Sequence, residues 1–198
     1  MEKFILKDGV SVNDVSGVES CYSQINGETL VCSVSAEKLR GLAESAVKAL
    51  RKPLFFFAEV PCTEDEENAL GGGLHKNVYY LDNCTEDVCL AIVKRYGNLL
   101  FSDGLLEFGF GSHADNSEIY FRKYQTVQIY SPDTKPFEAL LEKNGIKRVS
   151  EVRTLWDVLS EENFGECVCV EADGETIYDM IEILSGAGLY KSHTAEDN

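Results

Sequence analysis

The chain has 198 residues, 44% of them hydrophobic, with 34 acidic and 18 basic residues and a formal net charge of −16. A chain of this length and apolar content can fold around its own core, so disorder is excluded for most of it. The longest apolar run, residues 53–60, is far shorter than the roughly 20 residues of a membrane span, and the N-terminus lacks the apolar segment of a signal peptide. We therefore expect a cytoplasmic protein with no membrane contact.

The first half of the chain has three clear structural signals. Asn26-Gly27 lies between two short apolar runs and predicts a β-hairpin, because both residue types tolerate the positive φ angles of tight turns. Apolar residues recur every three or four positions from Leu39 to Leu50, which predicts a helix that Pro53 ends. The apolar run 54–60 predicts a buried strand, so residues 28–60 read as a strand–helix–strand crossover.

The middle of the chain begins with an acidic and then glycine-rich segment, residues 61–73, that predicts a loop. A short strand and a helix that ends at Gly97 follow. Asp103-Gly104 lies between two apolar runs and predicts a second hairpin. Alternation of apolar and polar residues over 119–130 predicts one long strand or two shorter ones.

Two further helices, near residues 134–144 and 175–185, and a strand at 167–170 bring the total to about four helices and six or seven strands. The predicted hairpins make the sheet partly antiparallel. We therefore predict an α+β fold, in which about four helices pack on a mixed sheet, in one globular domain over residues 1–190. Residues 191–198 are expected to form a disordered tail.

Two glycine-containing segments resemble functional motifs but lack the required spacing. Gly71-Gly72-Gly73 precedes Lys76 without the Gly-x4-Gly-Lys-Ser/Thr pattern of a phosphate loop, so we expect no nucleotide or other cofactor. Gly109-Phe110-Gly111 precedes Ser112 without the Gly-x-Ser-x-Gly pattern of a hydrolase elbow. The alternating glycines instead predict a bent or bulged strand against which another element packs closely.

Cys62, His75 and His113 are the candidates for a catalytic site. A cysteine nucleophile needs a lowered thiol pKa and a histidine within hydrogen-bond reach, and Cys62 begins the segment that also contains His75. The acidic residues beside Cys62 disfavour its thiolate. The alternative is that the seven cysteines are reduced and act as small buried apolar residues.

His113, Asp115 and Glu118 lie within six residues of one another and are candidate ligands of a divalent cation. Their spacing matches no metal-binding helix or calcium loop. The alternative is a turn in which these side chains cap backbone groups and contact water.

Tyr120, Arg122, Tyr124 and Tyr130 alternate with the apolar residues of their segment and are the candidates for binding a partner. Tyrosine and arginine are favoured at protein interfaces, although helices that cover a second face of the sheet would produce the same pattern.

The strongest charge asymmetry lies at the C-terminus, where residues 161–198 contain ten acidic residues and one basic one, Lys191. This charge opposes binding to nucleic acid and attracts a basic protein surface, or it serves solubility alone. Our leading hypothesis is a non-catalytic protein-interaction or regulatory domain, such as one that neutralises a toxin, with a basic partner. The alternative is a small hydrolytic or thiol-dependent enzyme with a Cys/His site.

Overall fold

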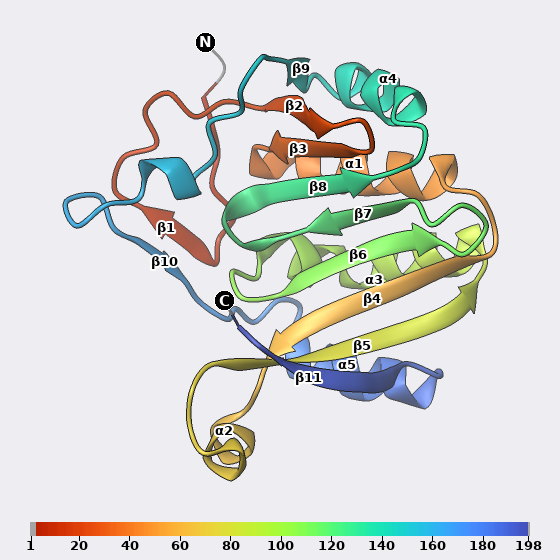
Figure 1. Cartoon of the computed structure of the whole chain (residues 1–198). Coiled ribbons are helices and arrows are strands. Elements are labelled where there is room, and N and C mark those ends of the chain that lie inside the picture. The colour runs from red at the N-terminus through yellow and green to blue at the C-terminus, as the bar shows by residue number, and fades with distance from the viewer. Residues whose placement is uncertain (1–2, 198) are drawn as a thin grey trace.

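The computed structural model in Figure 1 describes residues 3–197 and has five α-helices and two β-sheets, which confirms the predicted α+β class. In spatial order, the main sheet contains β11 (Tyr190–Glu196), β5 (His75–Cys84), β4 (Leu54–Pro61), β6 (Glu107–Ser112), β7 (Glu118–Phe121), β8 (Thr126–Tyr130), β3 (Thr29–Ser33), β2 (Cys21–Asn26) and β9 (Lys147–Arg148). A smaller sheet pairs β1 (Val10–Val12) with β10 (Gly165–Cys167). The helices are α1 (Ala36–Ala49), α2 (Glu64–Leu70), α3 (Glu86–Ser102), α4 (Lys135–Lys143) and α5 (Ile177–Gly186), and Lys123–Gln125 and Trp156–Val158 form 3-10 turns.

Neighbouring strands of the main sheet are antiparallel except for β2 and β9. The strands β3 and β4 are therefore parallel to each other, and β6, β7 and β8 lie between them. The chain passes from β3 through α1 to β4, so the predicted crossover is present. Three later strands fill the gap that it leaves.

The main core lies between the sheet and the helices α1, α3 and α5, which cover one face (Figure 1). Gly97 is buried in the middle of α3 and does not end the helix, contrary to the prediction. A Cβ atom at Gly97 would lie 2.4 Å from a guanidinium nitrogen of Arg40 in α1. The glycine therefore leaves room on α3 for the guanidinium group of Arg40. None of the helices within residues 3–197 has both the length and the apolar character needed to cross a membrane.

The predicted hairpin at Asp103-Gly104 is wrong. The apolar residues before it belong to the last turn of α3, which is apolar on several sides because it packs against both the sheet and neighbouring helices. Asp103 ends this helix and is fully buried. Its carboxylate accepts hydrogen bonds of 2.8 Å from the backbone N–H groups of Leu105, Leu106 and Val170. It thereby ties the end of α3 to the C-terminal part of the chain.

Two segments predicted to lack regular structure are ordered elements. The acidic segment after β4 contains the short helix α2, which begins with a capping box formed by Thr63 and Glu66. The segment from Lys191, predicted to be a disordered tail, forms β11 and pairs with β5. This strand is polar and lies at an edge of the sheet, so it lacks the apolar alternation of a buried strand. Asn198 lies outside the described residues.

Two further strand predictions hold in outline, whereas the strand predicted at 167–170 lies earlier in the chain, as β10. Asn26-Gly27 joins β2 to β3 in a hairpin, although neither residue has a positive φ angle. The segment 119–130 forms two strands, β7 and β8, and the 3-10 turn Lys123–Gln125 separates them.

Asp103→Ala should lower the free energy of unfolding by about 2–4 kcal/mol, because it leaves three backbone donors without their acceptor in a buried site. Urea unfolding followed by circular dichroism measures this loss. Asp103→Asn keeps an acceptor oxygen and should lose less. Equal stability of the alanine variant and the wild type would show that the contacts contribute little.

Candidate protein-binding face

The face of the main sheet opposite the helices, which we term the open face, carries no helix in the described part of the chain (Figure 1). The strand register identifies which residues have their side chains on this face, because paired residues of neighbouring strands point to the same side of the sheet. Phe57 pairs with Tyr80 of β5 and with Gly109 of β6, and Gly109 pairs with Tyr120 of β7. The centre of the open face is formed by Phe55, Phe57, Glu59, Tyr80, Glu107, Glu118 and Tyr120.

Two aromatic rings lie across the glycines of β6. A Cβ atom at Gly111 would lie 2.1 Å from the ring of Phe55, and one at Gly109 would lie 2.4 Å from the ring of Phe57. The predicted close approach at these glycines is therefore correct, but the pairing of β4 with β6 is regular and contains no bulge. The approaching groups are rings of the adjacent strand β4 and, at Gly109, also the backbone carbonyl oxygen of Ile119 in β7.

The ring of Phe57 is the centre of an aromatic cluster. Its centroid lies 5.1 Å from that of Tyr120 and 5.9 Å from that of Tyr80. Phe55 contacts Tyr80 at 6.0 Å and His113 at 4.8 Å. Because its neighbours surround it, Phe57 is only 3% exposed although no helix covers it. The rings thus form a packed layer on the open face.

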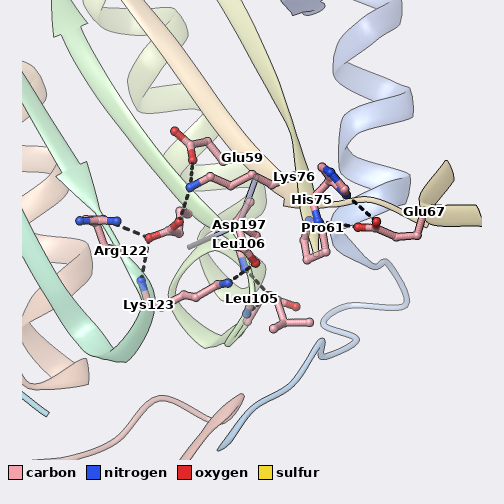
Figure 2. Close-up of polar contacts among 12 residues, drawn as sticks. Glu59, Pro61, Glu67, His75, Lys76, Leu105, Leu106, Arg122, Lys123 and Asp197 are labelled. Carbon is pink, nitrogen blue, oxygen red and sulfur yellow. Dashed lines mark hydrogen bonds and ion pairs between the residues drawn. The ribbon is translucent and has the colours of Figure 1, made fainter. Parts of the chain in front are cut away.

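A buried carboxylate organises the charged part of the open face, to which Lys76 and Arg122 in Figure 2 belong. Glu107 accepts hydrogen bonds from Lys76 Nζ at 3.0 Å and from Arg122 Nε at 3.2 Å, and its side chain is 4% exposed. The backbone N–H of Lys123 donates to it at 3.2 Å, and Lys76 also pairs with Glu59. Burial alone would raise the pKa of Glu107, but Lys76, Arg122 and the Lys123 N–H outweigh it and hold the pKa below 4.5.

Glu118 is the exception among these carboxylates. Within residues 3–197 its side chain has no hydrogen-bond or ion-pair partner, although it is only partly exposed. Burial and, next, repulsion from Glu59 raise its pKa above the ordinary value. The open face therefore contains one carboxylate that lacks a cation.

The predicted catalytic residues are not assembled into one site. The thiol of Cys62 donates to Asn77 Oδ1 at 3.4 Å, and burial followed by Glu66 and Glu67 raises its pKa, which disfavours the thiolate. The ring of His75 faces Glu67, with Nδ1 at 2.6 Å from Oε2 (Figure 2). Cys62 and His75 contact each other through the backbone, because the Cys62 N–H donates to the His75 carbonyl at 2.9 Å.

His113 lies at the other end of β5. Its Nε2 is 2.9 Å from Oδ1 of Asp82, which is seven residues along the strand from His75. At about 3.3 Å per residue, this separates the two histidines by roughly 20 Å. The structure therefore does not bring His75 and His113 together.

The three candidate metal ligands also point to different partners. His113 contacts Asp82, whereas Asp115 accepts from the Ser117 N–H at 3.1 Å and lies 4.0 Å from Arg51 Nε. Glu118 lies on the open face. No group of three potential metal ligands is present between residues 3 and 197.

The four residues predicted to bind a partner are divided between two places. Tyr120, Arg122 and Tyr130 belong to the open face. Tyr124 has a φ angle of 52° in the 3-10 turn, which interrupts the alternation of the strand. It is buried in a separate small core beside β1, and its ring centroid lies 4.4 Å from that of Trp156.

Other residues of the open face were not identified from the sequence. Phe55 and Phe57 lie in an apolar run that predicts a strand buried on both sides. The facing glycines Gly109 and Gly111 were the available signal, because a strand without side chains on one face leaves room for rings from its neighbour.

Glu107→Gln should lower the free energy of unfolding at pH 7 by about 3 kcal/mol, because Lys76 and Arg122 lose a buried countercharge. The pKa of Glu107 is below 4.5 in the folded protein, so its stabilising effect is complete above this pH and is lost as the pH falls through the folded value. The variant should therefore lose less stability than the wild type on acidification. Urea unfolding between pH 7 and pH 3 tests both effects. The control is Glu166→Gln, at an exposed position. If Glu107→Gln were as stable as this control at pH 7, the stabilising role of Glu107 would be contradicted.

Comparison with models of protein families, with curated proteins and with solved structures finds no match for the chain. The function of the open face is therefore inferred from its own geometry and charges.

Proposed function

We propose that this chain is a non-catalytic protein-binding domain and that a protein partner docks on the open face. The observation that carries this proposal is the layer of aromatic rings on a sheet face that no helix of the described chain covers. Protein interfaces are enriched in tyrosine, phenylalanine and arginine at their centres, and these residues contribute most of the binding energy. Tyr130, at the end of β8, is 42% exposed and extends the aromatic layer towards solvent.

The packing of the open face favours binding because little side-chain freedom remains to be lost. Phe57 is held by rings on two sides, and Arg122 is fixed between Glu107 and the ring of Tyr120, whose centroid is 5.2 Å from the guanidinium carbon. Ordering a mobile side chain at an interface costs about 0.5–1.5 kcal/mol. Side chains that are already ordered avoid this cost.

The charge of the protein favours a partner with a basic surface. The chain has a net charge of −16, and Glu118 adds an unpaired carboxylate to the open face. The acidic residues of the C-terminal third are distributed over several elements, including Glu166 in β10, Asp179 and Glu182 in α5, and Glu196 in β11. They therefore act through the long-range field of the whole molecule, which speeds association with an oppositely charged partner.

Tyr130→Ala should reduce recovery of the partner at least about tenfold, because it removes an exposed ring from the binding face. The matched control is Tyr178→Ala on α5, since Tyr178 has a similar exposed fraction (39%) and also donates one hydrogen bond through its hydroxyl. Tagged wild-type and variant proteins are cross-linked in lysate of the source organism at low and high salt, and recovered proteins are quantified by mass spectrometry.

The proposal requires a partner that cross-links to β4–β8 and is lost with Tyr130→Ala but retained with Tyr178→Ala. High salt should weaken its recovery, because attraction between opposite charges is screened. Equal recovery with both variants, or cross-links confined to the helices, would contradict docking on the open face.

A further inference from the structure

Glu118 is unusual because its surroundings leave it partly buried without neutralising it. The other carboxylates near the centre of the open face have donors: Glu107 binds Lys76 and Arg122, and Glu59 shares Lys76. Asp82 at the edge of this face accepts from His113 and from the Tyr190 hydroxyl. Removing a carboxylate from water without a partner is unfavourable, so a missing cation is the natural complement of Glu118.

Aromatic residues neighbour Glu118 in the strand register. On one side Glu118 pairs with Gly111, over which the ring of Phe55 lies. On the other side it pairs with Tyr130 of β8, and Tyr120 follows two residues along the same strand on the same face. Tyr80 belongs to the same group of rings, since its ring centroid lies 6.0 Å from that of Phe55. A cation that reached Glu118 would therefore contact ring faces as well as the carboxylate.

Arg122 shows how the same surface already binds a guanidinium group. The guanidinium carbon of Arg122 lies 5.2 Å from the ring centroid of Tyr120, and its Nε donates to Glu107 at 3.2 Å. This arrangement combines a cation–π contact with a charge-assisted hydrogen bond. Glu118 and the neighbouring rings offer the same two components on the other side of Tyr120, but residues 3–197 supply no cation there. A planar guanidinium suits such a site better than an ammonium group, because it can stack on a ring and donate to a carboxylate at once.

We propose that Glu118, which has Phe55, Tyr120 and Tyr130 as neighbours on the open face, binds an arginine side chain of the protein partner. This inference rests on the proposed function of the open face and names the chemical group that the face recognises. The arginine would stack against the rings while its N–H groups donate to the Glu118 carboxylate, and it would neutralise the one uncompensated charge at the centre of the face.

The probe is the peptide acetyl-Gly-Arg-Gly-amide, titrated into the full chain and followed by NMR of the aromatic rings. The resonances of Phe55, Tyr120 and Tyr130 should shift and saturate. Glu118→Gln should weaken this binding at least about fivefold, since the charge-assisted hydrogen bond is lost. Glu182→Gln is the matched control, because it removes the same charge from an exposed position on α5, on the helical side of the sheet. Glu118 has no partner in the described chain, so its replacement should leave the fold intact.

A peptide with citrulline in place of arginine has nearly the same shape without the charge and should not bind. The absence of a saturable shift with the arginine peptide would overturn the proposal, and so would equal binding of the citrulline peptide or of its lysine counterpart. Unchanged affinity of Glu118→Gln would overturn it as well. If Tyr130→Ala loses the partner while Glu118→Gln retains it, the open face binds a protein without this arginine. If both variants retain the partner, the proposed function itself fails.

Discussion

The helices formed by residues 3–197 pack against one face of the nine-stranded sheet, so the opposite face must be ordered by its own side chains. In the described chain two devices achieve this. The rings of Phe55 and Phe57 lie across glycines of the next strand, and the buried carboxylate of Glu107 is held by Lys76, Arg122 and a backbone N–H. The first device joins β4 to β6, and the second joins β6 to β5 and to the residues that follow β7. The result is a surface that is rigid without being covered, which is the property on which the proposed binding function depends.

Much of the fold follows from local patterns in the sequence. The helix from Ala36 and the strand from Leu54 have unambiguous periodicity and were predicted closely. The hairpin at Asp103-Gly104 was wrong because α3 is buried over much of its surface, so its apolar run resembles a strand. The strand β11 was missed because its residues are polar and its stability comes from pairing with β5, a contact that no local pattern encodes.

The candidate site was predictable only in part. Tyr120, Arg122 and Tyr130 were selected from their alternation, and the structure places all three on the open face. Tyr124 shares the same spacing but lies in the 3-10 turn, where positive φ angles at Tyr124 and Gln125 interrupt the strand and Tyr124 packs into another core. The contribution of Glu107 could not be predicted, because its three donors come from two separate places, Lys76 in β5 and the residues Arg122 and Lys123 that follow β7. Such convergence depends on strand order, which residue spacing does not reveal.

The position of β11 has a consequence for synthesis of the protein. The strand β5 is complete at residue 84, but the strand that covers its outer edge begins at residue 190. At synthesis rates of about 5–20 residues per second, a ribosome needs roughly five seconds or more to make the intervening chain. During that time the nascent β5 presents unpaired backbone groups to other chains. Newly made protein, before residue 196 emerges, is thus the form most exposed to edge-to-edge association, and chaperones would be expected to act at this stage.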